Sequence, residues 1–212
     1  MEDEYLPTYH APVVVFGEKY VTDQQTILIM KEKVLSLSGD SAKIKDFDGN
    51  IKYQIKGKLL TLHERSTLLD ADKNFIAELE KKLASLHTRV KLKDATGAVR
   101  VVVMRSHIVQ LRSSCHIYVF RDKKTKGYDK NPPDFKVKGD FFARKFTILD
   151  QEERVVARVR REMFSARNVL FGQDSYVLQV APLVDSAFVT FVVMALDEIF
   201  SDQGDKKDGV FF

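Results

Sequence analysis

The longest apolar stretch of the chain lies near its C-terminal end. Between 187 and 196 every side chain except Thr190 is apolar, so a helix here would be hydrophobic all round, as in a helix enclosed on every side. Pro182 precedes the stretch, Asp185 or Ser186 can serve as its N-cap, and polar residues and glycine follow it. We therefore predict a buried helix over about 183–200.

A membrane span is the alternative explanation of this stretch. The apolar run covers about ten residues, or roughly 15 Å of helix, whereas the hydrocarbon core of a bilayer is roughly 30 Å thick. Asp185 lies at one end of the run, and Asp197 and Glu198 lie at the other. The length favours a core helix, and no transmembrane span is expected.

The rest of the chain alternates between short apolar runs and turn residues. Asp48, Gly49 and Asn50 separate two such runs, which is a strong hairpin signal because Gly and Asn tolerate the positive φ of a tight turn. Region 75–86 also has a helical alternative, and we keep a strand there. The predicted strands cover residues 26–30, 42–47, 51–55, 59–63, 67–70, 75–79, 89–93, 99–105, 115–120, 135–138, 145–149, 154–160 and 175–180. This order predicts an antiparallel barrel or sandwich.

Alternation with period two is clearest in two of these runs, and it predicts a basic surface. In 154–160, Val155, Ala157 and Val159 share one face, and three arginines share the other; run 135–138 repeats this arrangement with two lysines. If these strands are neighbours, their basic side chains could hold phosphate oxygens. The predicted lipid- or phosphate-binding residues are Lys136, Lys138, Arg154, Arg158 and Arg160.

An antiparallel sheet with one apolar face can close its edges by forming a barrel, and the barrel must then be filled. We predict that the C-terminal helix fills it. The expected organisation is a flexible arm over 1–12, one barrel domain over 13–200 and a tail over 201–212. Residues 122–133 and 165–174 are predicted to be loops.

Composition narrows the functional classes. The 212 residues are 44% hydrophobic and contain one cysteine, Cys115, which excludes an internal disulfide; no secretory leader is visible, so we expect a cytoplasmic protein. Between Arg100 and Arg167 there are 17 Lys or Arg and 8 Asp or Glu. Such a basic segment attracts polyanions, either anionic lipid or nucleic acid, although it is also compatible with an ordinary solvated surface.

Catalytic and metal-binding motifs are absent from the sequence. The five histidines have no metal-ligand spacing, and Cys115 and His116, as strand neighbours, point to opposite faces. Cys115 is expected to be a buried structural thiol. There is no Walker motif, Rossmann glycine set or nucleophile elbow. We expect no enzyme activity, no cofactor and no metal.

Three segments resemble the plant LURP-one-related group, within the tubby C-terminal-like superfamily that also holds the phospholipid scramblases. The strongest is Gly172-Gln173-Asp174-Ser175-Tyr176-Val177-Leu178-Gln179-Val180-Ala181-Pro182-Leu183-Val184-Asp185-Ser186-Ala187-Phe188 with Leu196-Asp197-Glu198-Ile199 after it, which is similar to the closing strand, turn and helix of the family. The others are Leu62-His63-Glu64-Arg65-Ser66-Thr67-Leu68-Leu69-Asp70-Ala71-Asp72 and Asp134-Phe135-Lys136-Val137-Lys138-Gly139-Asp140-Phe141. The chain departs from the family in having no Trp after the last of these.

The resemblance implies a mainly β, tubby C-terminal-like fold: a closed antiparallel barrel of about twelve strands around a hydrophobic C-terminal helix. It also implies a non-enzymatic role in signalling or plant defence, with anionic phospholipid, such as phosphoinositide, or a protein as the partner. We expect a monomer that is peripheral at the plasma membrane, and a nuclear pool stays open. The alternative is a scramblase-like protein whose helix inserts into the membrane. Nucleic acid ranks last because stacking aromatics are not evident among the basic residues.

Overall fold

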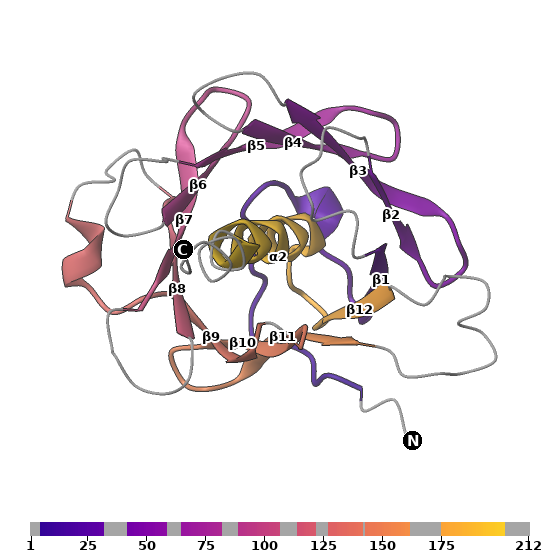
Figure 1. The fold of residues 1–212 in the computed structure, drawn as a ribbon. Coiled ribbons are helices and arrows are strands. Elements are labelled where there is room, and N and C mark those ends of the chain that lie inside the picture. Colours follow the sequence, from indigo (N-terminus) through magenta and orange to yellow (C-terminus); the bar gives the residue numbers. More distant parts are fainter. Residues whose placement is uncertain are drawn as a thin grey trace, which may run out of the picture.

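The computed structural model describes residues 5–31, 42–58, 65–81, 89–106, 114–121, 127–141, 143–161 and 175–201. They form a closed antiparallel barrel in which each strand pairs with its neighbours in sequence, and β1 closes the ring by pairing with β12 (Figure 1). The strands are β1 (Thr26–Lys31), β2 (Ala42–Asp46), β3 (Ile51–Lys58), β4 (Arg65–Asp70), β5 (Phe75–Lys81), β6 (Arg89–Lys93), β7 (Val99–Arg105), β8 (Ser114–Val119), β9 (Phe135–Asp140), β10 (Lys145–Asp150), β11 (Val155–Arg161) and β12 (Ser175–Val180). The predicted fold class is confirmed.

The helix α2 (Ser186–Ser201) runs through the middle of this ring (Figure 1). All its side chains from 186 to 200 are buried, and Phe188 and Phe191 are fully enclosed. Asp185 is the N-cap, since its Oδ1 accepts the N–H of Phe188 at 3.0 Å. The helix begins three residues later than predicted because Leu183 takes a positive φ of 68° and Val184 pairs with the N-terminal segment.

Four hairpins turn in the same way at one end of the barrel, which we call the entry end because α2 also starts there. Each turn opens with an aspartate whose Oδ1 accepts the N–H groups two and four residues further on, at 2.8 to 3.1 Å. The residue three positions after the aspartate has a positive φ, and a bulge follows. The four aspartates are Asp46, Asp70, Asp94 and Asp150. The expected Asp48-Gly49-Asn50 turn is one of these four.

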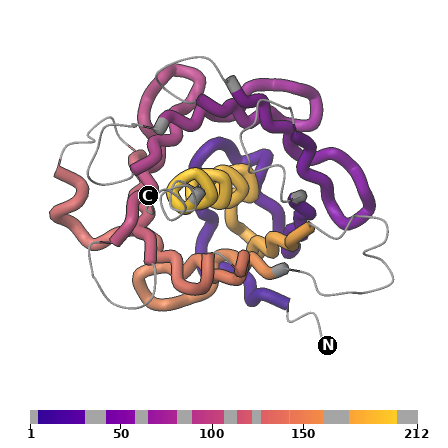
Figure 2. Tube along the Cα trace, viewed as in Figure 1, coloured from indigo at the N-terminus to yellow at the C-terminus, as the bar shows by residue number. Residues whose placement is uncertain are grey.

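The N-terminal segment closes the entry end. Residues 5–20, which we call the strap, lie against the start of α2 (Figure 2). Leu6 and Tyr9 are buried in the core, and the Tyr9 hydroxyl donates to Asp150 Oδ2 at 2.7 Å. The carboxylate of Asp185 accepts the N–H groups of strap residues Val15 and Phe16. The expectation of a loose arm is therefore wrong for residues 5–12, because two apolar side chains there reach the core.

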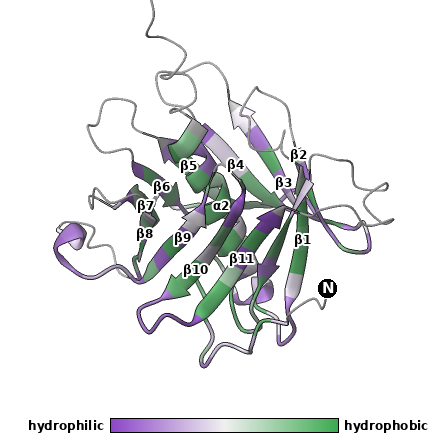
Figure 3. Ribbon diagram, turned by 60° about the horizontal axis from the view of Figure 1, so that its bottom comes forward, coloured by the Kyte–Doolittle hydropathy of each residue, from purple (hydrophilic) through white to green (hydrophobic). Residues whose placement is uncertain are grey.

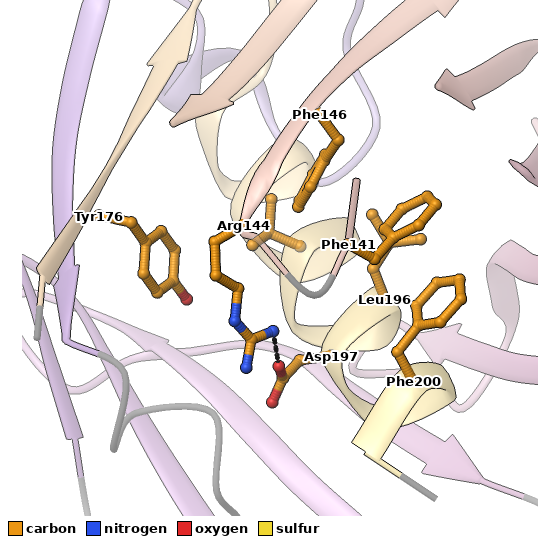
Figure 4. A pocket seen from close by; sticks show the side chains of 8 residues that line it. Phe141, Arg144, Phe146, Tyr176, Leu196, Asp197 and Phe200 are labelled. Carbon is orange, nitrogen blue, oxygen red and sulfur yellow. Dashed lines mark hydrogen bonds and ion pairs between the residues drawn. The ribbon is translucent and has the colours of Figure 1, made fainter. Parts of the chain in front are cut away.

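The opposite, exit end holds the last turn of α2 (Figure 4). Arg144, in the turn between β9 and β10, forms an ion pair with Asp197 of the helix. The ring of Phe141 stacks on that of Phe200, with centroids 4.1 Å apart. These side chains surround a cavity of about 10 Å³, enough for about one water molecule. The hairpin thus fixes the end of the helix by charge and by stacking.

The remaining predictions concern one strand with a helical alternative, two loops, one further strand and the C-terminal tail. Residues 75–81 form strand β5, as preferred over a helix. Residues 127–133 of the predicted loop include a 3₁₀ turn, Tyr128–Lys130, whose Tyr128 packs against Tyr118 and Phe120. The predicted strand at 59–63, the loop residues 122–126, the loop at 165–174 and the tail from 202 onward lie outside the described residues.

Candidate functional site

The predicted basic residues lie on strands that are separated by β10. Strand β9 pairs with one side of β10, and β11 pairs with the other. Thr147 of β10 is in register with Lys138 on one side and with Arg158 on the other, so these three residues form a row across the outer face. Lys136 and Arg160 lie on the same face by alternation. Four of the five residues therefore share one surface.

Arg154 is not part of this surface. The bulge between β10 and β11 interrupts the alternation, and Arg154 lies in the turn before β11 starts. Its Nε donates to Asp150 Oδ2 at 2.6 Å, and its guanidinium lies 5.5 Å from the ring centroid of Tyr9. Burial of Asp150 acts to raise the pKa of its carboxyl, but the hydrogen bonds from Tyr9 and Arg154 outweigh this and lower it. Arg154 thus anchors the strap.

Part of the charge on β9 to β11 is neutralised within the protein. Lys138 Nζ lies 2.5 Å from Glu153 Oε2, and this hydrogen bond lowers the pKa of Glu153. Arg154 is also paired with Glu152, at 2.6 Å. Arg158 and Arg160 are half-buried. The predicted surface is therefore less available to a polyanion than the count of basic residues suggests.

A second basic surface lies on the hairpin of β2 and β3, and the sequence analysis missed it. Its exposed residues are Lys43, Lys45, Lys52 and Lys56, which we call the lysine face. The inner positions between them, such as Ile44 and Tyr53, are buried, so alternation turns all four lysines outward. Of these four lysines, only Lys52 has a described carboxylate within ion-pair distance: its Nζ lies 3.6 Å from Asp46 Oδ2. The spacing of these lysines, two apart in β2 and four apart in β3, was a visible signal.

The other outer faces are of different character. Across β4, β5 and β6, Arg65, Glu78, Glu80 and Lys93 form ion pairs in rows. The hydrogen bond from Lys93 lowers the pKa of Glu80, opposed by burial. Across β7 and β8 the outer face is apolar and lies under Tyr128. Figure 3 shows the mixture of hydrophobic and hydrophilic residues along the strands. The described carboxylates on the outer face of β5, those of Glu78 and Glu80, are therefore already paired with Arg65 and Lys93.

The side chains of Cys115 and His116, which could be reactive, lie on opposite faces of strand β8. Cys115 is buried in the core, and desolvation raises the pKa of its thiol to about 12. His116 points to the opposite, outer side, where its ring meets that of Tyr118 edge-on. Among the described residues, no group of three or more His, Cys, Asp or Glu could hold a metal ion, and no helix is both long and apolar enough to cross a membrane.

Comparison with known proteins places this barrel in a family. The family model described as LURP-one-related matches residues 26–197, from the first strand into the enclosed helix. The chain belongs to the LURP-one-related family. The resemblance found in the sequence is thereby confirmed.

The LURP-one-related relatives include several proteins of Arabidopsis thaliana. Protein LURP-one-related 15 is 27% identical over 198 residues, covering 91% of this chain and 88% of the relative. Protein LURP-one-related 1 is 25% identical over 190 residues, covering 88% and 83%. A crystal structure of an Arabidopsis thaliana protein superimposes with a TM-score of 0.58 at 20% identity, covering 88% of this chain and 98% of that one. This likeness supports the fold.

Proposed function

We propose that this LURP-one-related barrel is a non-enzymatic module that docks reversibly on anionic phospholipid, phosphoinositide included, at the surface of a membrane in signalling or defence. The observation that carries the proposal is the lysine face. Lys43, Lys45 and Lys56 are exposed, lie on one hairpin and have no described carboxylate within ion-pair distance. Lysines without a counter-ion among the described residues are available to an external anion.

The magnitude fits transient docking. Each Lys or Arg near an anionic membrane contributes about 1 kcal/mol, so these three lysines supply about 3 kcal/mol, or roughly a hundredfold in affinity. Lys136 can add to this, whereas Lys138 must first break its ion pair with Glu153. Lysine suits a diffuse lipid surface because its ammonium is a point charge without the bidentate geometry of arginine.

The scramblase-like alternative, in which α2 inserts into the bilayer, finds less support. The helix is enclosed by the barrel, and its removal would expose the apolar inner face of the strands. Exposing this apolar area to water is unfavourable, so insertion of α2 would require other apolar groups to cover the inner face of the barrel. Surface docking needs no such rearrangement.

Vesicle co-sedimentation tests the proposal. Wild-type protein should sediment with phosphatidylcholine vesicles that contain phosphatidylinositol phosphates, and not with pure phosphatidylcholine; high salt should release it. The triple variant Lys43→Glu, Lys45→Glu, Lys56→Glu should lose at least about two orders of magnitude in affinity, because it removes three attractive charges and adds three repulsive ones. Lys130→Glu, an exposed lysine of the connection between β8 and β9, is the matched control.

A second variant tests the predicted site on β9 to β11. Reversal of Lys136, Lys138, Arg158 and Arg160 to Glu should weaken vesicle binding less than reversal of the lysine face does. The predicted site is wrong if this variant binds like wild type. The docking function itself is wrong if wild-type protein ignores anionic vesicles at physiological salt.

A further inference from the structure

An open cleft lies at the entry end of the barrel and is not used by the docking proposed above. Its volume is about 570 Å³, within the range of roughly 300–1,000 Å³ that is usual for ligand sites. One wall is the strap, over residues 9–15. The others are the two ends of the connection between β8 and β9 and the turn between β10 and β11.

The strap offers an unpaired strand edge to this cleft. Val13 pairs with the turn before α2: its N–H donates to Leu183 O at 2.9 Å, and its C=O accepts from Asp185 N at 3.0 Å. Backbone groups alternate in direction along an extended chain, so the C=O of Pro12 and the N–H of Val14 face the other way. Neither has a hydrogen-bond partner among the described residues. Val14 is also 39% exposed, unusually so for a large apolar residue.

The wall that faces the strap carries one positive and one negative side chain, neither of which forms an ion pair with a described residue. Arg121 is exposed, with no described carboxylate within ion-pair distance. Asp134 is exposed, and among the described residues its Oδ2 accepts the N–H of Val119 alone, at 2.8 Å. The other charged groups of the cleft, around Asp150, are already bonded to each other or to the strap. Among the described residues, the cleft therefore presents one cation and one anion that form no ion pair.

We propose that this cleft binds an extended peptide segment of a partner protein. The peptide adds as a strand along strap residues 12–14, accepting from Val14 N–H and donating to Pro12 C=O. An acidic side chain of the peptide meets Arg121, a basic one meets Asp134, and an apolar one covers Val14. A flat membrane cannot reach the backbone groups inside a cleft, so this site differs from the lysine face in ligand as well as in place.

Selection from a phage-displayed library of random linear peptides tests the proposal without lipid. Peptides selected on wild-type protein should share an acidic residue at one position next to apolar residues. Selection on Arg121→Glu should replace that acidic residue by a basic one, a change that a merely structural role for Arg121 would not produce. Lys130→Glu, outside the cleft, should return the wild-type consensus.

The backbone contact has its own test. Val14→Pro removes one N–H at an edge that Val13 already holds extended, and it should weaken the selected peptide about fivefold to tenfold. The bound peptide should slow amide exchange at Val14 and leave the lysine face unchanged. The proposal is overturned if no peptide is enriched, or if Arg121→Glu selects the same consensus as wild type.

Discussion

Asp185 is expected to hold three parts of the molecule together. Its Oδ1 caps α2, and its Oδ2 accepts the N–H groups of Val15 at 3.1 Å, Phe16 at 2.7 Å and Gly17 at 3.3 Å. Burial raises the pKa of this carboxyl, and these hydrogen bonds oppose the shift. Replacing Asp185 by Ala removes all four acceptor contacts at once.

The expected cost follows from these contacts. Loss of an N-cap costs about 1 kcal/mol, and each buried N–H left without an acceptor costs about 1–3 kcal/mol. If the strap stays in place, Asp185→Ala should lower the free energy of unfolding by about 4 kcal/mol or more. If the strap detaches, its N–H groups reach water, but the burial of Leu6 and Tyr9 is lost, so the cost is that of the cap plus that of the lost burial.

Denaturant unfolding combined with amide exchange separates these outcomes. Asp185→Asn keeps one acceptor oxygen and should lie between wild type and Asp185→Ala. Asp134→Ala removes an exposed carboxylate that accepts one N–H, so it should change stability by about 0.5 kcal/mol or less. A loss below about 1 kcal/mol in Asp185→Ala, with exchange at Val15 and Phe16 unchanged, would refute the role of this carboxylate.

Further predictions concern the core, the turns and acid stability. Phe188→Ala should cost about 3–5 kcal/mol in denaturant unfolding, since Phe188 is fully buried, whereas Ala at the exposed Phe47 should cost far less. Gly139→Ala should destabilise the protein more than Gly97→Ala does, because both have positive φ but only at Gly139 would a Cβ lie 2.4 Å from a backbone oxygen, that of Lys145. Burial acts to raise the pKa of the Asp94 carboxyl, but the hydrogen bonds from Thr96 and Ala98 outweigh burial and lower it. The contribution of this carboxylate to folding stability is therefore present above about pH 4 and is lost as the pH falls through the folded-state pKa. Stability measured against pH should fall less steeply in acid for Asp94→Asn than for wild type.

The sequence predicts the parts of this fold that depend on local patterns. The enclosed helix follows from its apolar run, which only Thr190 interrupts, and the hairpin at Gly49 follows from turn residues that accept a positive φ. Two of the four aspartate turns are harder to see, because Lys73 and Glu153 adopt positive φ without being glycine or asparagine. The bulge that removes Arg154 from the predicted surface has no signature in the alternation of 154–160.

The contacts that sequence cannot supply are those between distant residues. Glu153 neutralises Lys138 across a hairpin, 15 positions away, so a count of charges overestimates the basic surface. The burial of Tyr9 depends on Asp150, 141 positions away, and no local pattern reports it. The lysine face, by contrast, was present in the alternation of both strands and was overlooked because the net surplus of charge lies elsewhere.

The order of elements has a consequence for synthesis in the cell. Every strand leaves the ribosome before α2 does, so the nascent sheet has apolar inner faces and nothing to put between them. Folding of the barrel therefore waits until α2 is made, and exposed strands are prone to aggregate during that interval. A chain stalled before Asp185 should persist bound to chaperones, whereas release of the finished chain should allow it to collapse around its helix.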